Sequence, residues 1–278
     1  MRCRFSVPRP QPLALSLFLL TLPASAEEKD PRTAASVQDN SFLIEEAYNH
    51  EAGVVQHIVT LRRQNRDWFF NFTQEWPIGG QTHQFSYGLP YSWIRNDSEQ
   101  RVRGLGDVQL NYRFQALMES DSVPAFAPRL SWILPTGDKE KGTGVGSHGV
   151  QVSLPVSKIV SDRVTVHGNA GVTSYFNVDG QRPTSYNLGG SVIYAVNRDF
   201  NLMLESLGEW TETVNELREI EREFRYTVSP GFRQAFNLDA GQLVVGVAAP
   251  VGLVNGKRPD YGLFLYLSFE HNFLPKKK

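Results

Sequence analysis

Cysteine is almost absent from the 278-residue sequence, in which Cys3 is the only one. This excludes a framework of disulfides and a cysteine-based metal or redox site. Long hydrophobic runs are also lacking, because no apolar stretch beyond the N-terminal segment approaches the roughly 20 residues of a spanning helix. The charge is close to balanced, with 28 basic and 29 acidic residues. That balance provides no strongly basic surface, and no nucleic-acid partner is expected.

The first 26 residues have the order of a secretory signal. Three arginines precede an apolar core, 13–22, and a small-residue cleavage sequence ends at Ala26. The core is about ten residues long, which suits a signal and falls short of a membrane anchor. We therefore predict export and cleavage after Ala26. Removal of the three arginines leaves 25 basic against 29 acidic residues, a net charge of about −4.

Residues 261–273 alternate with a period of two, which predicts a β-strand rather than a helix. One face is apolar, whereas the other carries Glu270 and Asn272. The apolar face needs either a second sheet or lipid to cover it, and lipid cover would turn the polar face toward a lumen. A last strand that closes on Phe273 resembles the final strand of bacterial outer-membrane barrels, where that residue helps assembly. The barrel assembly machinery is therefore an expected partner, and 274–278 form a short basic tail.

The same alternation recurs along the chain and is cleanest at 108–114, where Val, Leu, Tyr and Phe alternate with polar residues. Twelve such segments make an even number of strands, as a closed barrel with both ends on the periplasmic side requires. Short turns alternate with longer loops, which a soluble sandwich has no reason to do. The predicted fold is all-β: a transmembrane antiparallel up-and-down β-barrel of about 12 strands over residues 53–273.

Three connecting segments have defined expectations. Residues 27–52 form a polar lead-in or a plug, within which 42–51 either start a strand or form a helical turn at or inside the barrel mouth. The first outer loop is expected at 62–67. The outer loop 211–223 has apolar residues at near-helical spacing and carries either a helical turn or an extension of its strands.

Charged side chains are expected on the parity that faces the lumen, because Arg or Lys facing lipid at the midplane costs about 2–4 kcal/mol. Both signs suggest ion pairs between strands, such as Glu205 or Glu209 with Arg225 or Arg233. Such pairs either stiffen the barrel or form a polar constriction that filters solutes. The lumen-lining candidates are Glu75, Asp107, Arg113, Arg129, Glu205, Glu209, Arg225, Arg233 and Glu270.

No pattern of catalysis, cofactor binding or metal ligation stands out. The glycine-rich run 142–149 has the spacing of a dinucleotide-binding loop, but a strand rather than a helix is predicted to follow it. Ser147 and His148 are neighbours in this run, where a preorganised nucleophile and base are not expected. The six histidines are scattered. We therefore assign no catalytic, cofactor-binding or metal-binding residues and expect no cofactor.

Arginines are concentrated in the first two predicted outer loops. They either remain solvated or contact phosphates of lipopolysaccharide. Outer-membrane lipid and lipopolysaccharide are therefore expected partners. The arginines are Arg62, Arg63, Arg66, Arg95, Arg101 and Arg103.

Three runs resemble a known family: FTQEWPIGGQTHQFSYGLPY at 72–91, GLGDVQLNYRFQAL at 104–117 and LPTGDKEKGTGVGSHGVQVSLPVSK at 134–158. The Gly-x-Gly-Asp start at 104–107 and the Pro-Thr-Gly-Asp loop at 135–138 carry most of the likeness. These runs are similar to the outer-membrane transporter family named after the MetA pathway of phenol degradation. The resemblance covers the middle of the chain and implies an outer-membrane barrel that passes small organic solutes. It brings no catalytic residues with it.

The sequence thus predicts a bacterial outer-membrane channel for passive passage of small solutes, with aromatic or hydrophobic ones as candidates. Because a small barrel leaves little free lumen, a narrow or gated pore is expected. Two alternatives stay open. One is a barrel that binds a partner or stabilises the envelope without transport. The other is a membrane-embedded lipid-modifying enzyme.

Overall fold

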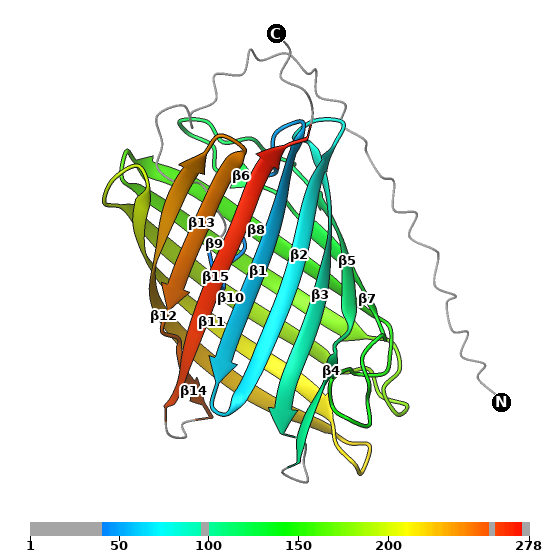
Figure 1. Ribbon diagram of the computed structural model, residues 1–278. Helices are drawn as coiled ribbons and strands as arrows, with labels where there is room; N and C mark the ends of the chain where they lie inside the picture. The colour runs from blue at the N-terminus through cyan, green and yellow to red at the C-terminus, as the bar shows by residue number, and fades with distance from the viewer. Residues whose placement is uncertain (1–40, 96–99, 256–258, 274–278) are drawn as a thin grey trace, which may run out of the picture. The chain divides into compact units, whose positions relative to one another are not determined.

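The computed structural model describes residues 41–95, 100–255 and 259–273, whose strands form one antiparallel sheet that closes on itself (Figure 1). The predicted signal, 1–26, and the basic tail, 274–278, lie outside the described residues. The described part of the chain contains no helix that is long and apolar enough to cross a membrane.

Fifteen strand segments make up the twelve strands of the wall. They are β1 (Val54–Gln64), β2 (Asp67–Ile78), β3 (His83–Arg95), β4 (Arg101–Leu105), β5 (Val108–Phe114), β6 (Ala125–Phe126), β7 (Arg129–Leu134), β8 (Gly149–Ser161), β9 (Val164–Tyr175), β10 (Thr184–Ala195), β11 (Phe200–Val214), β12 (Ile220–Leu238), β13 (Gly241–Ala248), β14 (Val251–Val254) and β15 (Asp260–Asn272).

The barrel closes where β1 pairs antiparallel with β15, from Val54 opposite Asn272 to Gln64 opposite Gly262. The predicted closed barrel of twelve antiparallel strands is therefore confirmed. Three wall strands are interrupted, because β4 with β5, β6 with β7, and β13 with β14 each form one strand in two pieces. Two of the three breaks contain a proline, which has no N–H to donate to the ladder.

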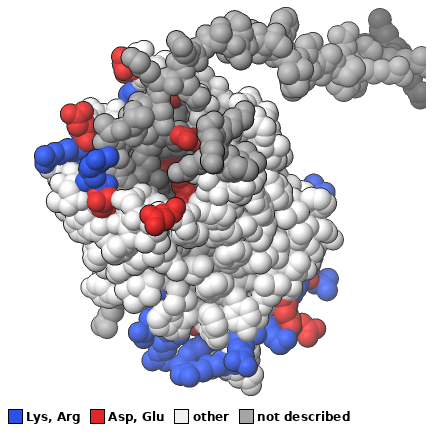
Figure 2. Space-filling view, turned by 45° about the horizontal axis from the view of Figure 1, so that its top comes forward, with Lys and Arg blue, Asp and Glu red and all other residues white. Residues whose placement is uncertain are grey.

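The two faces of the wall have opposite chemistry. Along β15, Leu263, Leu265 and Leu267 are exposed on the outward face, while Phe264 and Tyr266 are buried on the inward face. Outward positions elsewhere are also large and apolar, and Figure 2 shows a wide band of uncharged side chains between the charged ends. Such a band is what a lipid-facing barrel presents, since monomeric soluble proteins rarely expose apolar patches of more than a few hundred Å².

The two ends of the barrel also differ. We call the end where β1 begins and β15 ends the terminal end, and the opposite end the loop end (Figure 1). The loop end carries the long connection between β7 and β8, whereas the turn between β8 and β9 at the terminal end spans only Asp162 and Arg163. Most connections at the loop end are therefore longer than most turns at the terminal end, as expected.

One predicted outer loop differs from the structure, and a second adopts one of its two predicted forms. The loop expected at 62–67 is a tight turn at Asn65 and Arg66, because β1 continues to Gln64 and Asn65 adopts a left-handed φ of 55°. The region 211–223 extends the strands, since β11 runs to Val214 and β12 begins at Ile220. The strand extension is confirmed there, and the helical turn is wrong: the apolar spacing reflects two paired strands.

Candidate functional site

Residues 41–53, which we call the plug segment, precede β1 and lie inside the barrel. Their path is irregular, so both interpretations of 42–51, a strand start and a helical turn, are wrong. Ile44, Ala47 and Asn49 are at most 1 % exposed. An irregular backbone can be buried only if its polar groups find partners, and the wall supplies them.

Side chains of the wall accept the backbone N–H groups of the plug segment. Oε1 of Glu205 accepts from Leu43 N at 2.8 Å and from Ile44 N at 3.1 Å. Ser157 Oγ accepts from Ala47 N at 2.8 Å, and Gln115 Oε1 accepts from Asn49 N at 2.9 Å. Gln84 Oε1 accepts from His50 N at 2.8 Å. Polar residues spread around the wall thus replace the strand partners that this backbone lacks.

A charged network holds the middle of the plug segment. Arg129 Nε donates to the two carboxylate oxygens of Glu45 at 2.8 and 3.0 Å. Arg113 lies 3.6 Å from Glu45 and 3.8 Å from Glu75, and its Nε donates to Asn49 Oδ1 at 2.7 Å. Both arginines are mostly buried, so their charges are compensated inside the barrel rather than by bulk water.

The tip of the plug segment is aromatic. The ring of Phe42 lies 5.3 Å from that of Phe264 and 5.2 Å from that of Tyr266, centroid to centroid. Glycine makes room for it: a Cβ on Gly246 would lie 2.3 Å from Phe42, and one on Gly189 would lie 2.5 Å from Ile44. Glycine inside a strand often marks such a close approach.

A cavity of about 280 Å³ remains between the plug segment and the wall formed by β1, β2, β3, β5, β7 and β15. Charged residues line one part of it, including Glu75, Arg113 and Arg129, while Phe42 and Tyr266 line another. Within the barrel, a mixed-charge surface and an aromatic surface therefore face the same space.

Of the nine lumen-lining candidates, three come together in this network: Glu75, Arg113 and Arg129. Glu205 Oε1 accepts from the backbone of the plug segment, and its carboxylate also interacts electrostatically with Arg233, one of its two predicted partners. Glu270 lies 3.9 Å from His50 at the other end of the plug segment.

The remaining candidates lie elsewhere in the barrel. Arg225 Nη1 donates to Asp260 Oδ2 at 2.9 Å, so its expected pairing with Glu205 or Glu209 is wrong. The reason is geometric: Glu209 is directly opposite Arg225 in the ladder, but the guanidinium reaches β15 instead. Arg233, 2 % exposed, lies on β12, the strand that also carries Arg225.

Asp107 does not lie on a strand; it anchors a loop at the loop end. Its carboxylate accepts from Gly137 N at 2.9 Å and from Val145 N at 2.7 Å. This brings the two halves of the β7–β8 loop so close that a Cβ on Gly137 would lie 2.6 Å from Gly144 Cα. The glycine-rich run is thus a closely packed loop. In the preceding part of the β7–β8 loop, hydrogen bonds from Lys141 lower the pKa of Asp138.

The loop geometry gives no support to a hydrolase. Ser147 Oγ donates to the backbone oxygen of His148, and the imidazole Nδ1 accepts from Trp132. A second pair, Ser157 Oγ and His167 Nδ1 at 2.7 Å, is buried under the plug segment and contributes to its binding. No group of His, Cys, Asp and Glu suited to a metal ion occurs among the described residues.

Sequence reasoning did not identify the partners in the plug segment itself, Glu45 and His50. Their side chains follow no strand parity, because the backbone around them is irregular. Inward glycines such as Gly189 and Gly246 were a usable signal, since they leave space for another part of the chain.

The family model described as "Putative MetA-pathway of phenol degradation" matches residues 45–249. The COG4313 outer membrane channel from Pseudomonas putida F1 has 13 % sequence identity and a TM-score of 0.61, over 86 % of this chain and 100 % of that chain. The KdgM porin has 13 % identity and a TM-score of 0.48, over 79 % of this chain and 99 % of that chain. No curated protein sequence matches the chain. At such low identity, the first structural likeness shows a shared fold.

Proposed function

The chain belongs to the MetA-pathway phenol-degradation family, and on this premise we propose that it is an outer-membrane channel for diffusion of small solutes. The terminal end would face the periplasm and the loop end the outside. The apolar outward wall and the signal-like N-terminus support this location. The buried polar interior supports a water-filled path rather than a second hydrophobic core.

The observation that carries the proposal is the cavity beside the plug segment. It combines guanidinium and carboxylate groups with the rings of Phe42 and Tyr266. An apolar cavity of roughly 150 Å³ suffices to bind benzene, so about 280 Å³ accommodates one substituted aromatic ring. We infer a solute with a single ring and a polar or anionic substituent, which agrees with the name of the family.

The plug segment limits passage in this proposal. Hydrogen bonds and ion pairs hold most of its length, and water can replace polar contacts more readily than packed apolar ones. A shift of this segment would widen the polar path without unfolding the wall. The channel would therefore be narrow at rest and gated from within.

Influx into proteoliposomes tests the proposal. We expect the 4-hydroxybenzoate anion, which crosses bare bilayers slowly, to enter at least tenfold faster than a disaccharide. Equal rates would indicate a wide, unselective pore. No influx of either solute would indicate a barrel that does not transport. Phe42→Ala is the matched variant: it enlarges the cavity and is expected to reduce the discrimination between the two solutes.

A further inference from the structure

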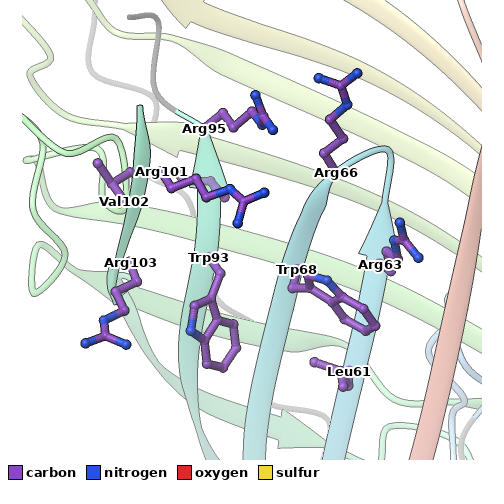
Figure 3. A pocket seen from close by; sticks show the side chains of 10 residues that line it. Leu61, Arg63, Arg66, Trp68, Trp93, Arg95, Arg101, Val102 and Arg103 are labelled. Carbon is purple, nitrogen blue, oxygen red and sulfur yellow. The ribbon is translucent and has the colours of Figure 1, made fainter. Parts of the chain in front are cut away.

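A groove of about 830 Å³ opens on the outward face of β1–β4 near the loop end (Figure 3). It is separate from the interior cavity, because alternate residues of each strand point to opposite faces. Gln64 and Arg62 face the interior, where Gln64 donates to Asp260, so Arg63 between them faces outward. Trp93 on β3 is 41 % exposed on the same face.

Four side chains form a row across the groove. Strand pairing places Arg63 opposite Trp68, Trp68 opposite Trp93, and Trp93 opposite Arg103. Figure 3 shows the two indole rings side by side, with an arginine on each flank. The guanidinium of Arg63 lies 5.6 Å from the centroid of the Trp68 ring. The aromatic face of Trp68 thus holds one cation at the outer surface.

The rows on either side of this one differ in character. Toward the middle of the barrel, Leu61 lies opposite Phe70, Phe70 opposite Tyr91, and Tyr91 opposite Leu105. Toward the loop end, the strands present further arginines. Charge therefore ends abruptly at the tryptophan row, and an apolar surface begins there.

Arginine dominates the described lining of the groove. Five of the ten described residues that line the groove are arginines, and none of the ten is an aspartate or glutamate. Arg63, Arg66, Arg101 and Arg103 make no ion pair with a described residue. Lys and Arg also gather at the loop end in Figure 2. Such a cluster calls for an external anion with several negative charges.

We propose that this groove binds a phosphorylated lipid of the outer leaflet, of the lipid A type, with its phosphates on the arginines and its acyl chains along the apolar rows. The groove and the lipid match in geometry. In the lipid, the phosphates lie at the membrane surface and the acyl chains lie deeper. In the groove, the arginines lie nearest the loop end, the tryptophans come next, and the apolar rows lie toward the middle of the barrel. Trp at the depth of lipid headgroups is a general feature of membrane barrels. The inference shares the proposed outer-membrane location but does not depend on solute passage.

Native mass spectrometry of the purified protein in neutral detergent tests the site. The probe is lipid A with two phosphates, compared with the same lipid without phosphates. The test variant is Arg63→Gln/Arg103→Gln. The control is Arg182→Gln/Arg218→Gln, which removes the same charge from exposed loops at the same end. We expect wild type and control to bind lipid A at least tenfold more tightly than the test variant does. We also expect both of them to bind lipid A at least tenfold more tightly than they bind the phosphate-free lipid.

Equal binding by the test variant and the control would overturn the proposal. Displacement of the lipid by millimolar inorganic phosphate would overturn its lipid part, because it would reveal a site for a free anion. Channel conductance measured on the same three proteins separates the two proposals. The groove lies outside the lumen, so the test variant is expected to conduct as the wild type does. A wild-type protein that conducts but binds no lipid A would refute the lipid proposal alone, and one that binds lipid A but does not conduct would refute the channel proposal alone.

Discussion

Arg129 on the wall and Glu45 in the plug segment meet inside the barrel, with Arg129 Nε 2.8 Å from Oε1 and 3.0 Å from Oε2 of the carboxylate. Ser153 Oγ also donates to this carboxylate, at 2.8 Å. Glu45 is therefore one point at which a charge of the plug segment is bound to the wall. Its neutralisation is the smallest change that weakens the plug segment without altering the barrel.

Glu45→Gln is expected to raise the open fraction of the channel roughly fivefold. A hydrogen bond to a charged group contributes roughly 1.5–3 kcal/mol, against roughly 0.5–1.5 kcal/mol for a neutral one, so about 1 kcal/mol of binding is lost. Single-channel recording measures the change. Glu216→Gln, an exposed substitution in the β11–β12 loop, is the control. An unchanged open fraction in Glu45→Gln would show that the plug segment does not limit passage.

Glu205→Ala is expected to lower the free energy of unfolding in detergent by about 1–3 kcal/mol. The substitution leaves the N–H groups of Leu43 and Ile44 buried without their acceptor. Glu205→Gln should be much milder, because the amide keeps an oxygen in the position of Oε1. Thermal unfolding followed by circular dichroism compares the two variants. Equal melting temperatures for Glu205→Ala and Glu205→Gln would mean that the side-chain acceptor does not contribute to stability.

Tryptophan fluorescence should be quenched strongly by lipids brominated on their acyl chains. Strand parity places every tryptophan of the chain on the outward face, and three of them are at least 41 % exposed. Lipid bromine reaches these rings, whereas an aqueous quencher in the lumen does not. Fluorescence that responds only to aqueous iodide would contradict a lipid-facing wall. The residues are Trp68, Trp76, Trp93, Trp132 and Trp210.

Asp107→Ala should loosen the β7–β8 loop and leave the barrel intact. Two backbone N–H groups lose their common acceptor, so Lys139 and Lys141 become more accessible to trypsin. Limited proteolysis should show severalfold faster cleavage at these lysines than in wild type. Asp162→Ala, in a turn at the terminal end, controls for the loss of a carboxylate. Equal rates in both variants would mean that Asp107 does not hold the loop.

The wall could be predicted from the sequence because its signal is local. In a strand, Leu265 and Tyr266 differ in environment only through parity, and parity is visible in the residue order. The closed barrel of twelve strands follows from that rule. The charged positions Glu75, Arg113 and Arg129 were identified for the same reason, although their partners were not.

A plug was one of the expectations for this part of the chain, but its path could not be predicted, because distant residues determine it. Leu43 is bound by Glu205, 162 positions away, and Ala47 by Ser157, 110 positions away. No local periodicity records such contacts. The ion pair of Arg225 was mispredicted for a related reason: strand register defines which residues are opposite, whereas a long side chain can reach past its neighbour to Asp260.

Ion current through a planar bilayer that contains the purified protein tests the central claim most directly. The account predicts small, discrete current steps for the wild type and a larger open fraction for Glu45→Gln at the same voltage. The absence of steps in both proteins, at every voltage and with correct insertion confirmed, would contradict it. The molecule would then be a sealed barrel, and the plug segment a permanent part of its core.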